Sequence, residues 1–128
     1  MMKLNNNTIK EIYNDLNELA SIELQRSLWY CFNENQKSSS FVELFERLFD
    51  DHKVEFFVGY QMEDFNPSLE LRKGMNDLVE ALNKYDERDG SHDFILQDPN
   101  WMTISSQAKE VLRMWDSNSE LALVLKSA

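Results

Sequence analysis

The 128-residue chain contains one cysteine, three glycines and two prolines, and each scarcity excludes something. The lone thiol, Cys31, cannot form an internal disulfide, and its apolar neighbours favour a buried, inert side chain. Glycine and proline are too few for the many tight turns of a β-sandwich or barrel, whereas helices need few of either. We therefore predict an all-α fold, a compact bundle of six or seven helices. The domain is expected to be single over residues 1–128, with residues 1–7 disordered.

Long hydrophobic runs are also missing. The longest aliphatic run, Leu121 to Leu125, is too short to span a bilayer, and the N-terminus lacks the apolar core of a signal peptide. A cytoplasmic protein is therefore expected. Its formal net charge of −10 would be repelled by anionic lipids and by phosphate backbones, so we expect no direct binding to membranes or nucleic acids.

Motifs for catalysis and metal binding are absent from the sequence. His52 and His92 each stand beside acidic residues, but neither has a second soft ligand at helical spacing, which is typical of solvated histidines in acidic turns. There is no Gly-x-Ser-x-Gly elbow, and the three glycines are too scattered for a phosphate-binding loop. We predict that the protein is not an enzyme and uses no metal and no cofactor.

Helical periodicity is clearest in the first half of the chain. Thr8 to Glu11 has the form of a capping box, and the apolar stripe that follows changes face near Ser21, which predicts a break there. Residues 33–40 are polar and serine-rich and are expected to form a loop or exposed turn. A second capping box begins at Ser40, and the helix after it, Phe41 to Asp50, has apolar residues at ideal spacing.

The second half predicts three more helices. Asn66 and Pro67 are typical of an N-cap and a first helical residue. The apolar stripe of this helix extends to Tyr85, and Gly90 is the expected C-terminal stop. Residues 91–100 are expected to be a loop. Ser105 or Ser106 is expected to cap the next helix, and residues 121–125 form a short last helix.

Residues 53–62 fit two patterns. Val54, Phe56, Val58 and Tyr60 alternate as in a strand, while Val54, Phe57 and Val58 also match a helix interrupted by glycine. We favour the helix. The alternative is an α+β fold with a small strand pair at 53–62 and 93–97.

The acidic residues are concentrated in the middle of the chain. Between Glu43 and Asp98 there are 15 acidic and 6 basic side chains, which accounts for −9 of the net charge of −10. A concentrated field of one sign often steers or holds a partner of the opposite sign, although a solvated rim without a partner is the alternative. Aromatic side chains beside the acids could anchor such an interface. We expect Phe65 to be in the core, and the candidate partner-binding residues are Asp50, Asp51, Tyr60, Glu63, Asp64, Asp86, Glu87, Asp89, Asp93, Asp98 and Trp101.

In size, acidity, helical content and lack of catalytic motifs, the chain resembles the small acidic immunity proteins of bacterial toxin systems, in particular the contact-dependent growth inhibition immunity family. That resemblance implies one tight partner, neutralised by direct masking, and it carries over no functional residue. We predict an inhibitor that masks the active site of a basic toxin, most simply a nuclease, because nuclease sites are cationic. A monomer within a heteromeric complex is expected rather than a homo-oligomer.

Two other classes of function stay open. An acidic secretion chaperone or other non-catalytic adaptor would be favoured by a true strand at residues 54–62 in a dimeric α+β protein. An enzyme that uses buried carboxylates would require a metal or show a raised carboxylate pKa.

Overall fold

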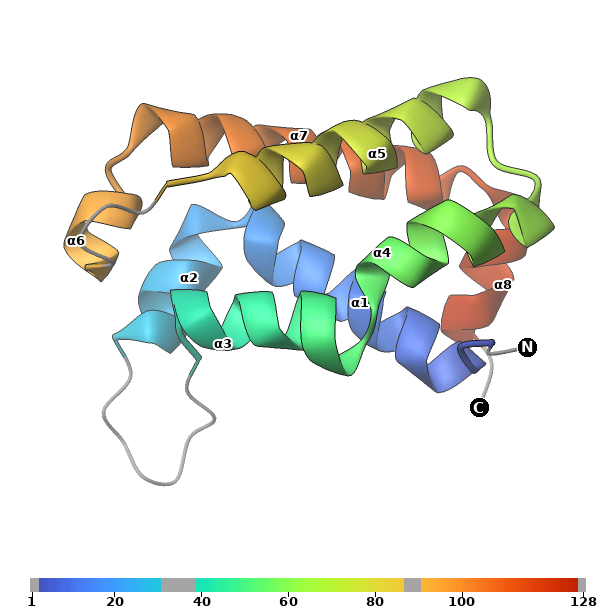
Figure 1. Cartoon of the computed structure of the whole chain (residues 1–128), viewed down its shortest axis with the longest axis horizontal. Helices are drawn as coiled ribbons and strands as arrows, with labels where there is room; N and C mark the ends of the chain where they lie inside the picture. The colour runs from blue at the N-terminus through green and yellow to red at the C-terminus, as the bar shows by residue number, and fades with distance from the viewer. Residues whose placement is uncertain (1–2, 31–38, 87–90, 127–128) are drawn as a thin grey trace.

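The computed structural model describes residues 3–30, 39–86 and 91–126, and every regular element among them is helical (Figure 1). The all-α class is confirmed, with eight α-helices in the described part of the chain where six or seven were expected. Short π-helical segments and one 3-10 segment join some of them. In chain order the elements are α1 (Asn6–Ala20), α2 (Ile22–Trp29), α3 (Phe41–Phe45), η1 (Glu46–Asp51), α4 (Val54–Phe56), η2 (Phe57–Gln61), η3 (Met62–Phe65), α5 (Leu69–Lys84), α6 (His92–Ile95), α7 (Pro99–Asp116) and α8 (Ser119–Lys126).

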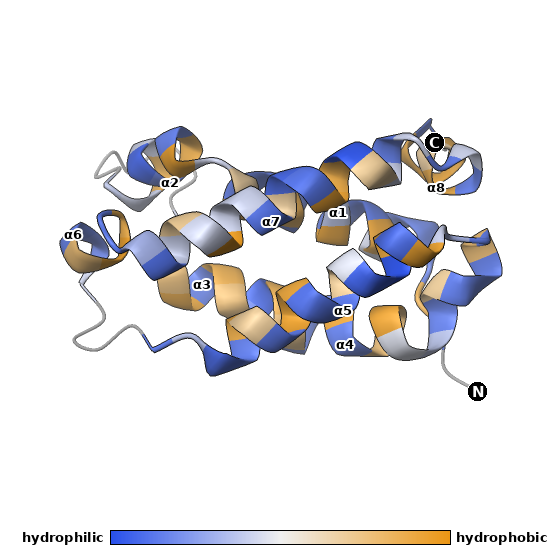
Figure 2. Ribbon diagram, turned by 90° about the horizontal axis from the view of Figure 1, so that it is seen from above, coloured by the Kyte–Doolittle hydropathy of each residue, from blue (hydrophilic) through white to orange (hydrophobic). Residues whose placement is uncertain are grey.

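Helix α7 is the longest helix and packs against both α1 and α5. α3 and η1 contact α1, and the chain continues through α4 and η2 along the face turned toward the viewer in Figure 1. α6 lies at one end of the long axis and α8 at the other. Orange and blue bands alternate along the long helices in Figure 2, the pattern of amphipathic helices that each bury one side.

Two tryptophans of α7 fix the core near the two ends of that helix. Trp101 is fully buried, and its indole nitrogen donates a hydrogen bond to Oε1 of Gln25 at 2.8 Å. Trp115 is also fully buried and stacks on Phe57, with ring centroids 5.7 Å apart. Large aromatic side chains contribute most of the apolar area in small cores, so these contacts join α7 to α2 and to η2.

The break predicted near Ser21 is confirmed. α1 ends at Ala20, and the hydroxyl of Ser21 then caps α2 by accepting a hydrogen bond from the Leu24 amide at 3.0 Å. The buried side chain of Gln25 donates to the carbonyl groups of Glu18 and Leu19 at the end of α1. Carbonyl groups at a helix end lack intrahelical partners, so this side chain stabilises the corner between α1 and α2.

The helix start predicted at Ser40 is confirmed, whereas the predicted starts of α1, α5 and α7 differ from the structure. Ser40 caps α3 by accepting a hydrogen bond from the Glu43 amide at 3.0 Å. The cap of α1 is Asn5 instead of Thr8, since Oδ1 of Asn5 accepts from the Thr8 amide at 2.8 Å. Both side chains can cap a helix, and the residue that takes the extended conformation decides the start.

The starts of α5 and α7 also differ from the prediction. Asn66 has a φ of 51° and ends η3, and Ser68 caps α5. Asp98 caps α7, with Pro99 at the first helical position, so the helix begins well before Ser105. The segment expected to be a loop therefore contains α6 and the first residues of α7. α5 ends at Lys84, and Gly90, the expected stop, lies outside the described residues.

Residues 54–62 are helical, as favoured, and no strand pair at 53–62 and 93–97 exists in the described structure. Lys53 has a φ of 52°, a left-handed conformation that separates η1 from α4. In η1 and η2 the backbone widens to π-helical hydrogen bonds, as between the His52 amide and the Arg47 carbonyl at 2.8 Å. The feature that would have favoured a secretion chaperone is therefore absent here.

The disorder expected for residues 1–7 is wrong for residues 3–7, which the structure describes. The side chain of Gln61 accepts from the Leu4 amide and donates to its carbonyl, each at 2.8 Å. These two hydrogen bonds hold the backbone of Leu4 on η2. Cys31 lies outside the described residues.

Candidate protein-binding surface

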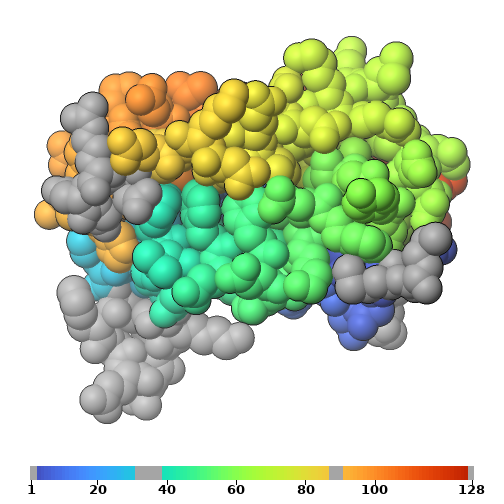
Figure 3. Space-filling view, viewed as in Figure 1, coloured from blue at the N-terminus to red at the C-terminus, as the bar shows by residue number. Residues whose placement is uncertain are grey.

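Residues 41–65, from α3 through η3, carry a dense set of exposed acids. Their seven carboxylate side chains are all exposed, and we call this set the acidic strip: Glu43, Glu46, Asp50, Asp51, Glu55, Glu63 and Asp64. In the space-filling view the segment forms a continuous teal-to-green band across one face of the molecule (Figure 3). Five of the residues predicted from the sequence belong to this segment: Asp50, Asp51, Tyr60, Glu63 and Asp64.

The cations of the same segment neutralise little of this charge. Arg47 turns inward, with Nη2 at 2.8 Å from a carboxylate oxygen of Glu18 and Nε at 3.7 Å from one of Asp15. Lys53 is exposed, and its Nζ donates to the backbone carbonyl of Asp50 at 3.3 Å. Lys3 approaches Asp64 at 3.7 Å in an exposed pair, which contributes little. The acidic strip is therefore a field of one sign on an otherwise mixed surface.

Helix α5 shows what a balanced surface looks like in this protein. Lys73 pairs with Asp77 at 2.8 Å and Lys84 pairs with Glu80 at 2.6 Å, each one turn apart. Such pairs compensate one another within the helix and leave no net local field. α3 to η3 thus carry a net charge of −5 and α5 carries none, while the remaining −4 of the central sequence lies in residues 85–98.

Apolar side chains lie open beside the acidic strip. Val42 is 60% exposed and Tyr60 is 74% exposed, the latter with its ring 5.5 Å from that of Phe56. A shallow groove of about 300 Å³ runs along α3 and η1, and its lining is Phe41, Val42, Phe45, Glu46, Phe49 and Asp50. Phe41 is 5% exposed and belongs to the core, and Phe45 and Phe49 are half-buried and pack against it. The sequence signal for their partial exposure is a second apolar stripe on the same helix, at positions 42, 45 and 49.

Other predicted residues belong to segments outside the acidic strip. Asp86 and Asp98 line a polar hollow of about 390 Å³ between the end of α5 and the start of α7. Asp98 also accepts a hydrogen bond from the Tyr85 hydroxyl at 2.7 Å, and Asp93 on α6 accepts one from the Tyr30 hydroxyl. The predicted carboxylates therefore do not all belong to one segment, and α6, which carries Asp93, lies at one end of the molecule (Figure 1). Glu87 and Asp89 lie outside the described residues.

Trp101 is not a surface anchor, and that prediction is wrong. Its side chain is 0% exposed, and its ring lies 5.1 Å from that of Tyr85 and 5.4 Å from that of Phe41. The sequence analysis placed Trp101 between a loop ending at residue 100 and a helix starting at Ser105 or Ser106, whereas it occupies the first turn of α7 and is buried in the core. Phe65 is half-buried and packs against the core, as expected.

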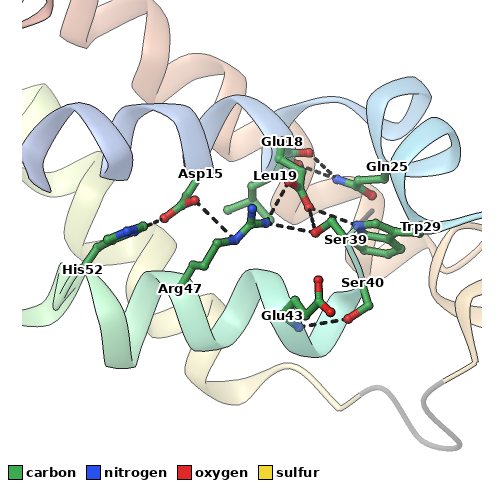
Figure 4. A network of polar contacts seen from close by, with 10 residues as sticks. All are labelled: Asp15, Glu18, Leu19, Gln25, Trp29, Ser39, Ser40, Glu43, Arg47 and His52. Carbon is green, nitrogen blue, oxygen red and sulfur yellow. Dashed lines mark hydrogen bonds and ion pairs between the residues drawn. The ribbon is translucent and has the colours of Figure 1, made fainter. Parts of the chain in front are cut away.

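Behind the acidic strip lies a buried network of charged groups that no sequence pattern indicated (Figure 4). Glu18, 5% exposed, accepts hydrogen bonds from the side chains of Trp29 at 3.1 Å, Ser39 at 2.7 Å and Arg47 at 2.8 Å. Charges taken out of water are tolerated only when they are paired and fully hydrogen-bonded, and Glu18 satisfies that condition. The network ties α1 to α2 and to η1.

His52 closes the other side of this network, so the prediction that it is a solvated histidine is wrong. Its Nδ1 lies 2.6 Å from Oδ2 of Asp15, and its side chain is 16% exposed. Burial raises the pKa of Asp15 from 3.8 to about 6, against the opposing effects of the His52 hydrogen bond and of the Arg47 charge. His92 is half-buried against the rings of Trp29 and Tyr30.

The network has one property expected of an enzyme that uses buried carboxylates, the raised pKa of Asp15. Neither Asp15 nor His52 lines the groove or the hollow described above. Within the described residues, no group of three or more His, Cys, Asp or Glu side chains is placed to hold a metal ion.

Comparison of the chain with known proteins identifies no family. Neither a family model, a curated protein sequence nor a solved structure matches the chain significantly. Among the described residues, none of the helices has the length and apolar character needed to cross a bilayer.

Proposed function

We propose that this protein is an immunity-type inhibitor that binds a basic toxin, most simply a nuclease, and masks its active site with the acidic strip. The observation that carries the proposal is the set of seven exposed carboxylates between Glu43 and Asp64, with Arg47 of the same segment turned inward. Nuclease sites are cationic because they hold phosphates, so a protein that presents carboxylates in their place can exclude the substrate.

Two further features support a binding function of this kind. The strip is accompanied by exposed apolar groups, Val42 and Tyr60, and apolar anchors within a charged rim are common at protein interfaces. The network of Asp15, Glu18 and Arg47 joins η1 to α1, so the strip belongs to a supported part of the fold. We propose that the protein acts in the cytoplasm, where a toxin that attacks nucleic acid meets its substrate.

The test is to tag the full chain, recover its complex from the native host and assay the captured protein. The proposal expects a basic protein in a one-to-one complex, with nuclease activity that stoichiometric addition of the purified chain abolishes. A captured protein that is acidic, or whose activity is unchanged by an excess of this chain, would contradict it. The control is a basic nuclease unrelated to the complex, which the chain should leave active.

A further inference from the structure

Helix α3 and segment η1 have two apolar sides, and only one of them belongs to the core. Leu44 and Leu48 are fully buried against the rest of the protein. Phe45 and Phe49 are half-buried, and together with the exposed Val42 they form a second stripe on a different side. One apolar stripe is enough to pack a surface helix. Phe45 and Phe49 are only partly packed against the core, so their exposed parts and Val42 present additional apolar surface among the described residues.

The aromatic rings of this second stripe form the floor of the groove on α3 and η1. The ring centroids of Phe41 and Phe45 are 4.5 Å apart, and those of Phe45 and Phe49 are 5.6 Å apart. The groove has a volume of about 300 Å³, at the lower end of the range for sites that take an apolar group. Contiguous rings in ordered contact give a firm apolar surface on which a side chain can pack.

The rim of the groove carries charge of one sign. Glu46 and Asp50 line it directly, and Glu43 and Asp51 are exposed on the same two turns. A second copy of this chain would bring like charges together at the rim, which is costly. Charge complementarity selects a cationic occupant, and the aromatic floor selects an apolar side chain.

We infer that the groove receives a cationic, amphipathic segment of the partner. An apolar side chain of that segment packs over Phe45 and Phe49, and its lysine or arginine side chains lie against Glu46 and Asp50. The identity of the natural partner rests on the function proposed above, whereas the chemistry of the groove can be tested without it.

The test uses two synthetic peptides as probes, an amphipathic helical peptide of lysine and leucine and a matched peptide of lysine and serine. Binding to the full chain is measured by fluorescence anisotropy at physiological salt. We expect the lysine-leucine peptide to bind more tightly than the lysine-serine peptide by about tenfold or more, because only the former can bury apolar area in the groove. Equal affinity for the two peptides, or no binding of either, would overturn the inference.

A matched pair of variants locates the site. Val42→Asp places a carboxylate in the groove, and Leu123→Asp makes the same change on α8, where Leu123 is 64% exposed against 60% for Val42. Both variants add one negative charge, which by itself would favour a cationic peptide. Since an acid in the first turn of a helix is stabilising, Val42→Asp should fold normally, which circular dichroism checks.

We expect Val42→Asp to lower the affinity for the lysine-leucine peptide by about fivefold or more and Leu123→Asp to leave that affinity unchanged. Equal effects of the two variants would overturn it. This result is separable from the proposed function. If the captured partner binds Val42→Asp as tightly as the wild type, the groove is not the binding site, but the proposed inhibitor function is unaffected. If the groove binds the peptide but the host contains no basic partner, only the proposed inhibitor function is refuted.

Discussion

Replacing Arg47 by methionine tests whether the buried carboxylates depend on this one cation. Arg47 contacts Glu18 at 2.8 Å and Asp15 at 3.7 Å, and the side chains of those two acids are only 6% and 3% exposed. Methionine keeps the apolar stem and removes the charge, so both carboxylates lose their guanidinium partner while Asp15 keeps His52. The variant leaves the packing of η1 close to that of the wild type.

The expected cost is about 3 kcal/mol of unfolding free energy at neutral pH. Removing one partner of a buried ion pair typically costs about 3–5 kcal/mol, and the lower end applies because 34% of the Arg47 side chain is exposed. The loss should shrink on acidification. Burial already raises the pKa of Asp15 to about 6, and Arg47 opposes that rise, so its removal shifts the pKa of Asp15 further upward. Protonation of Asp15 at pH 5 then removes the uncompensated charge of that side chain.

The assay is urea denaturation followed by tryptophan fluorescence at pH 7 and pH 5. The control is Lys84→Met, which breaks the exposed pair with Glu80 and should cost less than about 0.5 kcal/mol. Adding Glu18→Gln to Arg47→Met should recover part of the loss, because the amide oxygen still accepts from Trp29 and Ser39. The reasoning is refuted if Arg47→Met loses no more unfolding free energy than the control, or loses the same amount at pH 7 and pH 5. Either result would show that the buried carboxylates do not depend on the charge of Arg47.

Three other changes follow from the same structure. Burial raises the pKa of Asp15 in the folded state from 3.8 to about 6, so the wild type should lose stability as the pH rises from 4 to 7. Asp15→Asn should lose less unfolding free energy over the same range. Equal slopes of unfolding free energy against pH in the two proteins would contradict this. Gln25→Leu should cost about 3 kcal/mol in denaturant unfolding, since it leaves the buried Trp101 indole without its acceptor, and a loss below about 1 kcal/mol would be incompatible with that contact. Gly59→Ala should raise the thermal midpoint by the equivalent of about 0.5–1 kcal/mol, because the added methyl meets nothing within 4 Å, and a lowered midpoint would speak against this.

The parts of the fold that depend on local pattern could be predicted from the sequence. The break at Ser21 follows from a change of apolar face, and the cap at Ser40 from a serine directly before a strong amphipathic stripe. The starts of α5 and α7 could not be predicted as well. Near each start several residues can cap a helix, and only the folded backbone shows that Asn66 is left-handed and that Asp98 is extended.

The candidate site was predicted only in part for a different reason. Clustered acids such as Asp50 and Asp51 are visible in a sequence, and their exposure follows from their charge. The inward turn of Arg47 depends on Glu18, which is 29 residues away, and the burial of His52 depends on Asp15, 37 residues away. Contacts at such separations leave no periodic signal. The sequence alone therefore does not show that Arg47 pairs with buried acids and leaves the negative charge of the acidic strip largely uncompensated.

The acidic strip as the binding surface is tested most directly by association rates with the basic protein captured from the native host. Asp50→Lys/Asp51→Lys reverses two charges of the strip, and Glu11→Lys/Glu23→Lys makes the same change in net charge at exposed positions of α1 and α2. At low salt the strip variant should associate about tenfold more slowly or worse, with a smaller difference at high salt, while the control pair changes little. Equal association rates of the two double variants at low salt would show that the strip does not face the partner.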